Sequence, residues 1–183
     1  MVLEAIRYRK GTLHILNQLK LPHQVEYDEL RNADDGWHAI REMRTRGAPA
    51  IAIVAALSLA VELQNHKISD KGEEVAAFIT EKLDYLVTSR PTAVNLADAA
   101  RRLKQVVIEA AQQNGGSGIS VSQAYINAAA QMLIDDVSDN ERIGKHGAEW
   151  IAKEAREATG VSVITHCNTG YVQKLEHFIH ISY

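Results

Sequence analysis

The stretch APAIAIVAALSLAVELQ, residues 48–64, is apolar on nearly every side of the helix that it predicts. A helix without a polar stripe is buried on most of its faces, so we expect this one inside the fold. Its uncharged part ends at Val61, which makes it shorter than the ~20 residues that a membrane-spanning helix needs. The sequence therefore predicts a buried core helix and no membrane partner.

The segments on either side of this helix predict a mainly α fold with a small N-terminal β-hairpin (α+β). Residues 3–8 and 12–16 alternate between apolar and polar side chains, as the two strands of a hairpin do. Apolar residues recur at helical spacing in most of the remaining sequence, with a break expected near Gly144 or Gly147. The further helices are expected at residues 34–43, 71–89, 91–113 and 120–158.

A short apolar run, residues 161–164, is followed by the polar segment THCNTG at 165–170. A β-branched run that ends in a polar, glycine-terminated loop is typical of a buried strand at the ligand-binding edge of an α/β sheet. Only 13 residues follow this loop, too few for the rest of such a sheet. We therefore divide the chain into a hairpin-plus-helical domain at 1–160, a first strand and loop of a second domain at 161–170, and a tail at 171–183.

Composition limits the class of protein. The chain has 183 residues and a net charge of −3, which argues against a nucleic-acid-binding protein. It has one cysteine, so no internal disulfide can form, and its N-terminus lacks the features of a signal peptide. These features favour a cytoplasmic protein.

Two segments place an arginine just ahead of a proline: RGAP at residues 46–49 and RPT at residues 90–92. Proline suits the first turn of a helix, whose free N–H groups and partial positive charge attract anions. A guanidinium beside such a helix start matches the oxygens of a phosphate. The alternative is that both segments are ordinary helix starts with solvated arginines, and these residues alone leave the two interpretations open.

Cys167 is the candidate reactive residue of the loop at 165–170. Its neighbours are polar, unlike those of a buried structural cysteine, and His166 could lower the thiol pKa or move a proton. Adjacent strand residues point to opposite faces, however, so a direct Cys–His pair does not follow from the sequence. The histidines form no zinc-binding pattern. Three aspartates, Asp135, Asp136 and Asp139, are expected on a helix surface, where the pair Asp139 and Asn140 is a weak candidate for the border of a cleft.

Residues 46–51 (RGAPAI), 89–95 (SRPTAVN) and 165–170 (THCNTG) together resemble the methylthioribose-1-phosphate isomerase family, as does LEAIRY at 3–8. That family is related to subunits of the guanine-nucleotide exchange factor of translation initiation. The resemblance covers residues 1–170 and implies a Rossmann-like α/β second domain. It implies an aldose–ketose isomerase of methionine salvage, found in the cytoplasm and nucleus, that converts 5-methylthioribose 1-phosphate to 5-methylthioribulose 1-phosphate.

The resemblance also implies roles for particular residues. Arg46, Gly47 and Ala48 would contact the substrate, Arg90 would bind its phosphate, and Cys167 would act at the reacting carbons. No metal or organic cofactor is implied. Members of the family form homodimers, which we do not expect of a chain shortened in this way.

The second half of the family pattern has no counterpart in this sequence. The family places its catalytic aspartate in a Gly-Ala-Asp-Arg-like motif, and nothing after residue 170 resembles it. We therefore expect a C-terminally truncated isomerase with little turnover alone, since loss of an acid–base group costs about 10²–10⁴-fold in rate. The alternatives are a non-catalytic interaction module, an unstable product, and a member of the translation-factor branch, against which Cys167 argues.

Overall fold

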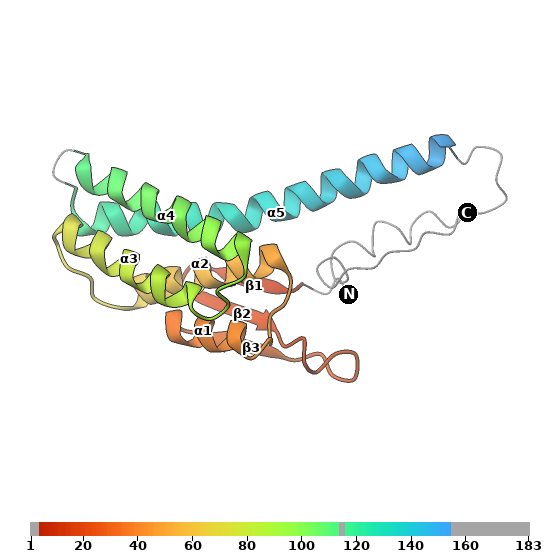
Figure 1. The fold of residues 1–183 in the computed structure, drawn as a ribbon, viewed down its shortest axis with the longest axis horizontal. Coiled ribbons are helices and arrows are strands. Elements are labelled where there is room, and N and C mark those ends of the chain that lie inside the picture. Colours follow the sequence, from red (N-terminus) through yellow and green to blue (C-terminus); the bar gives the residue numbers. More distant parts are fainter. Residues whose placement is uncertain (1–3, 114–115, 155–183) are drawn as a thin grey trace.

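The computed structural model describes residues 4–113 and 116–154. A three-stranded antiparallel sheet comes first and is followed by the helices (Figure 1). The strands are β1 (Ile6–Arg9), β2 (Thr12–Leu16) and β3 (Tyr27–Leu30); the helices are α1 (Ala33–Arg41), α2 (Ala48–Asn65), α3 (Gly72–Val87), α4 (Val94–Gln112) and α5 (Gly118–Glu154). The predicted fold class is confirmed for the part of the chain that is described.

The sheet contains the predicted hairpin and one strand more. β1 and β2 pair with Ile6 opposite Ile15, and β2 also pairs with β3, where Leu13 lies opposite Leu30. β3 is only four residues long, YDEL, and two of its residues are acidic. Acidic residues are rare in strands, which is why the pattern of alternation did not predict it.

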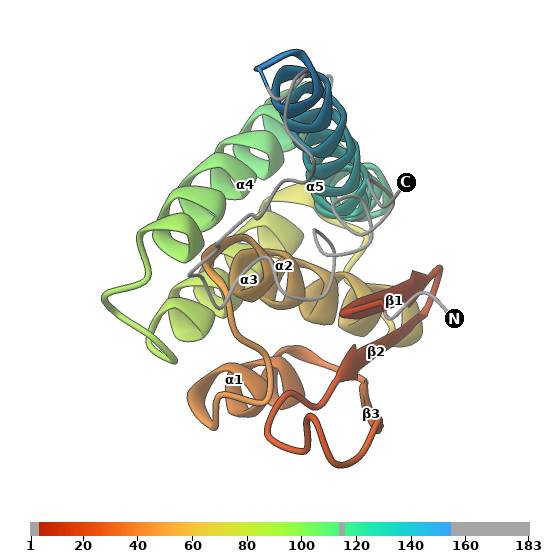
Figure 2. The ribbon, with the colours of Figure 1, turned by 90° about the vertical axis from the view of Figure 1, so that its right-hand side faces the viewer.

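Helix α2 lies at the centre of the molecule, as its sequence predicts. All residues from 51 to 63 are buried. Figure 2 shows α2 between α4 and α5 on one side and α1 and the sheet on the other, and it contacts each of these elements. By length and composition alone α2 could cross a membrane, but 67% of it is buried among the other elements, as in the core helix of many proteins.

Helix α1 packs very closely against α2. A Cβ atom built on Gly36 would lie 2.2 Å from the Ser58 Oγ and 2.6 Å from the Ser58 Cβ. Only glycine therefore permits this separation of the two helices. The start of α1 is also fixed, because the buried Glu62 of α2 accepts a 2.7 Å hydrogen bond from the backbone N–H of Ala33.

Helix α5 runs through both glycines near which a break was expected, so that expectation is wrong. A glycine within a helix costs only about 1 kcal/mol, which the neighbouring turns can offset. The first half of α5 packs on the body, where the fully buried Tyr125 donates a 3.1 Å hydrogen bond to the Ala56 carbonyl. The second half extends past the other described elements (Figure 1) and exposes Ile143 and Trp150.

Candidate functional site

The first arginine segment leads directly into α2. Gly47 is the N-cap residue, with φ 98° and ψ 133°, and Pro49 lies in the first turn, as predicted. A φ of this sign is strained for any residue with a side chain, so the turn depends on glycine. Ala48, the first residue of the helix, is exposed. Arg46 is half-buried, and its Nε donates a 3.1 Å hydrogen bond to the Met43 carbonyl.

The second arginine segment differs from its prediction. Helix α4 begins at Val94, so Pro91 lies in a turn before the helix and not in its first turn. The chain closes two tight turns here, with the N–H of Arg90 bonded to the Val87 carbonyl at 3.3 Å and that of Ala93 to the Arg90 carbonyl at 2.9 Å. These bonds direct the backbone away from a helical path for three residues, which delays the start of α4.

Side chains of α1 hold the turn that carries Arg90. The indole N–H of Trp37 donates to the Thr88 hydroxyl at 2.8 Å, and the Tyr85 hydroxyl donates to the Asp34 carboxylate at 2.5 Å. The rings of Trp37 and Tyr85 are stacked with their centroids 5.8 Å apart. Because of the hydrogen bond to Asp34, the pKa of Tyr85 rises to about 12. The turn is therefore anchored on α1 from two sides.

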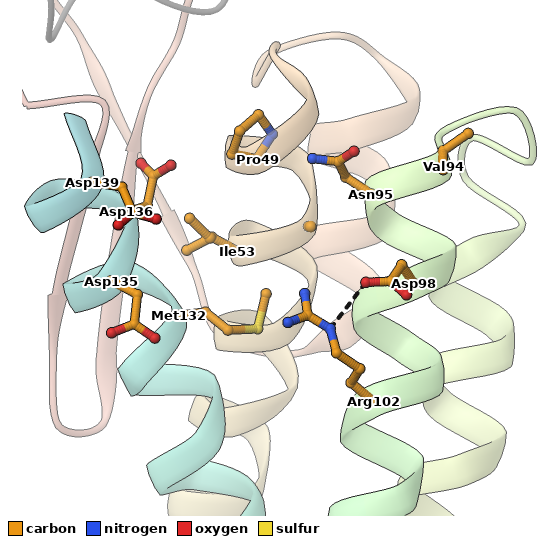
Figure 3. A pocket seen from close by; sticks show the side chains of 11 residues that line it. Pro49, Ile53, Val94, Asn95, Asp98, Arg102, Met132, Asp135, Asp136 and Asp139 are labelled. Carbon is orange, nitrogen blue, oxygen red and sulfur yellow. Dashed lines mark ion pairs between the residues drawn. The ribbon is translucent and has the colours of Figure 1, made fainter. Parts of the chain in front are cut away.

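A pocket of about 450 Å³ lies where the two arginine segments enter their helices. Figure 3 shows Pro49 and Ile53 of α2 between two polar walls, one from α4 and one from α5. The remaining described residues that line it are Ala52, Val94, Asn95, Asp98, Arg102, Met132, Asp135, Asp136 and Asp139.

The pocket brings together parts of two predicted motifs. Pro49 belongs to the motif at 46–51, and Val94 and Asn95 belong to the motif at 89–95. Arg46 and Arg90 themselves are not among its described lining residues. The structure thus places the helix starts that follow the two arginines at one cavity, while the guanidinium groups lie outside its described wall.

The described walls of the pocket are mainly acidic, because they carry the carboxylates of Asp98, Asp135, Asp136 and Asp139 and the single guanidinium of Arg102. Arg102 pairs with Asp98 at 3.0 Å, and Asp139 pairs with Arg142 along α5. A hydrogen bond from Arg101, together with the charge of Arg102, holds the pKa of Asp98 below its ordinary value. Within residues 4–113 and 116–154, no group of three or more potential metal ligands occurs.

Sequence reasoning missed one wall and gave too little weight to the other. Asp135 and Asp136 lie on the surface of α5 as expected, but they also line the cavity. Of the pair Asp139 and Asn140, which was predicted to border a cleft, Asp139 is in the described lining and Asn140 is not. The α4 wall was not predicted. Its signal was present in the spacing of Val94, Asp98 and Arg102, which recur every four residues and so share one face of the helix. That spacing shows that the three residues share a face of α4, but it does not show which element lies opposite this face. The pocket therefore could not be predicted from the sequence alone.

Cys167, His166 and the domain boundaries at 160 and 170 lie outside the described residues, so the roles and boundaries assigned to them stay predictions. Arg46, Gly47, Ala48 and Arg90 are described, but their contacts with a substrate stay predictions, as do the expected cellular location and partners.

Comparison with known proteins identifies the family. The model of the initiation factor 2 subunit family matches residues 44–180. The chain belongs to this family. Both arginine segments and the pocket lining lie within the matched residues.

Within the initiation factor 2 subunit family, similar curated relatives are named methylthioribose-1-phosphate isomerase, as the sequence motifs predict. The protein of this name from Pyrenophora tritici-repentis is 66% identical over 172 residues, which are 93% of this chain and 44% of that protein. The one from Aspergillus terreus is 54% identical over 175 residues, which are 93% of this chain and 46% of that protein. The chain therefore spans less than half the length of these relatives.

Two solved structures of the family share the fold. The 5-methylthioribose 1-phosphate isomerase of Pyrococcus horikoshii superposes with a TM-score of 0.71 at 30% identity, over 79% of this chain and 40% of that one. The delta subunit of translation initiation factor eIF-2B from A. fulgidus gives 0.70 at 29% identity, over 81% of this chain and 42% of that one. The fold alone does not separate the two branches, whereas the curated relatives favour the isomerase.

Proposed function

We propose that this chain carries substrate-binding residues of a methylthioribose-1-phosphate isomerase in methionine salvage. Arg46 and Arg90 bind the phosphate end of 5-methylthioribose 1-phosphate, and the backbone at Gly47 and Ala48 approaches the sugar. The observation that carries the proposal is the pocket at which the helix starts following both arginines meet. Two helix N-termini and two guanidinium groups suit a dianionic phosphate.

Cys167 completes the proposal as the group that acts at the reacting carbons. Moving a hydrogen between two carbons of a sugar needs a pair of poised acid–base groups. The motif that would supply the second group, an aspartate, does not occur in this sequence. For the 183 residues alone we therefore propose binding without substantial turnover.

Calorimetric titration of the purified chain with 5-methylthioribose 1-phosphate tests the proposal. We expect saturable binding that is lost in Arg46→Met and in Arg90→Met. Arg31→Met is the matched control, because Arg31 is exposed and pairs only with nearby acidic groups. Absence of binding to the unaltered chain, or equal binding by all three variants, would contradict the proposal.

A turnover assay adds a second test, with the relative from Pyrenophora tritici-repentis as positive control. We expect the 183-residue chain to be at least about 10²-fold slower than that relative. A rate equal to that of the relative would show that the aspartate motif is not required.

An interaction module without catalytic activity is the second candidate. It is favoured by the second half of α5, where Ile143 is 56% exposed and Trp150 is 65% exposed. The two positions are seven residues apart and so lie on one face of the helix, and an exposed apolar patch is a feature of protein–protein interfaces. Purification of the tagged chain from its cells tests this alternative, which predicts a partner of fixed stoichiometry that is lost in Trp150→Ala.

A further inference from the structure

The turn between α1 and α2, residues 42–47, contains Arg46 and provides a hydrogen-bond acceptor for its side chain. Two residues after the end of α1, Met43 has φ 61°, and it is the one non-glycine residue with a positive φ in the described part of the chain. The N–H of Met43 bonds to the Ile40 carbonyl and that of Arg44 to the Ala39 carbonyl, the pattern of a Schellman motif. Glycine is the usual residue at this position, since a side chain there is strained. The carbonyl of Met43 accepts the Nε–H of Arg46.

Arg44 fixes the same turn from the other side. Its Nη1 lies 2.8 Å from the Oδ2 of Asp28 on β3, and its Nε lies 2.9 Å from the Oε2 of Glu42. Its carbonyl accepts the backbone N–H of Gln18 at 2.9 Å. The side chain of Arg44 is therefore fixed by two ion pairs, and its backbone by a hydrogen bond from Gln18.

The pair of Asp28 and Arg44 is better shielded than the other arginine pairs of the described chain. The two side chains are 19% and 21% exposed, whereas Arg31 and Glu29 are 75% and 47% exposed. Asp28 also accepts a 3.1 Å hydrogen bond from the side chain of Asn17, which is itself buried. A shielded pair with further hydrogen bonds contributes more than a surface pair, because less solvent screens it.

We propose that the Asp28–Arg44 ion pair positions Arg46 for the substrate phosphate. This rests on the proposed function, which gives Arg46 its ligand. Asp28 and Arg44 act as positioning residues: they keep the turn in the strained form that directs the Met43 carbonyl at the Arg46 guanidinium. Thr45, between Arg44 and Arg46 in the sequence, is only 3% exposed. Loss of the pair releases the turn, and Arg46 then samples many rotamers.

The test measures Arg46 directly in the free chain. ¹⁵N relaxation of the Arg46 Nε–Hε bond gives an order parameter, which we expect near the rigid range in the unaltered protein. In Asp28→Asn and in Arg44→Met it should fall below about 0.6, the flexible range. Arg31→Met should leave it unchanged, since the exposed pair with Glu29 does not contact the turn.

A conservative variant separates positioning from folding. Arg44→Lys keeps the charge opposite Asp28 but loses the planar fork, so we expect an intermediate order parameter in a folded protein. An Arg46 order parameter that stays high in every folded variant would overturn the proposal, and Arg44→Lys provides that comparison even where Asp28→Asn does not fold.

The binding experiment distinguishes this inference from the proposed function. We expect the affinity for 5-methylthioribose 1-phosphate to fall about three- to tenfold in Asp28→Asn and not at all in Arg31→Met. If the unaltered chain binds no sugar phosphate, the proposed function fails while the order parameter still decides the role of the ion pair. If binding is lost in Arg46→Met but unchanged in Asp28→Asn, the proposed function stands and the positioning role is refuted.

Discussion

The segments at Arg46 and at Arg90 lead into two helices whose first turns line one pocket, but the two segments are held in different ways. At Arg46 the backbone has a positive φ at Met43, where a side chain makes it strained, and at Gly47, where glycine allows it. At Arg90 no residue of the turn has a positive φ, and side chains hold the turn: Trp37 donates to the Thr88 hydroxyl, and the Tyr85 hydroxyl donates to Asp34. The first turn depends on which residues occupy its own positions of positive φ, whereas the second turn depends on side chains of another helix that bond to it. Substitutions should therefore affect the two segments differently.

The largest difference is expected at the backbone. Gly47→Ala forces a side chain onto φ 98° and should lower the free energy of unfolding by about 1–3 kcal/mol. Thr92→Ala, its counterpart in the second segment, is exposed and should change it by less than about 0.5 kcal/mol. Urea unfolding followed by circular dichroism measures both. Equal effects would show that the first turn does not require glycine at residue 47.

A smaller effect is expected at the anchor of the second segment. Trp37→Phe keeps an aromatic ring beside Tyr85 but removes the N–H that bonds to Thr88, which should cost about 0.5–1.5 kcal/mol. Amide hydrogen exchange should speed up at Ser89 and Arg90 and remain unchanged at Thr45. Faster exchange at Thr45 alone would mean that Trp37 does not anchor the second turn.

A third effect depends on pH. In the folded protein the pKa of Tyr85 is about 12, above its ordinary value of 10, because its hydroxyl donates to Asp34. The native state therefore binds this proton more tightly than the unfolded state. The resulting stabilisation is complete below pH 10 and is lost as the pH rises from about 10 to about 12. Free energies of unfolding measured across this range should converge for the unaltered chain and Tyr85→Phe, and a constant difference would contradict the assignment.

These two segments also show how far the sequence alone could go. Periodicity predicted the buried α2 and the amphipathic α3, because those patterns depend on residues that are neighbours in the chain. It wrongly placed Pro91 inside a helix, and it did not predict the bond from Trp37 to Thr88 that anchors this turn, because that bond joins residues 51 positions apart. The pocket was missed in part for the same reason: the faces of α4 and α5 that form it are brought together only by their packing on α2. The ion pair of Asp28 and Arg44 likewise joins β3 to a turn 16 residues later.

Both arginine segments depend on helix α1, which is only nine residues long. Its end forms the turn before Arg46, and its exposed side anchors the turn before Arg90. Its distance from α2 is fixed where Gly36 meets Ser58. In thermodynamic terms the two segments are linked, since any shift of α1 changes the free energy of both. The two halves of the proposed phosphate site are thus parts of one cooperative unit, although 44 positions separate their arginines in the sequence.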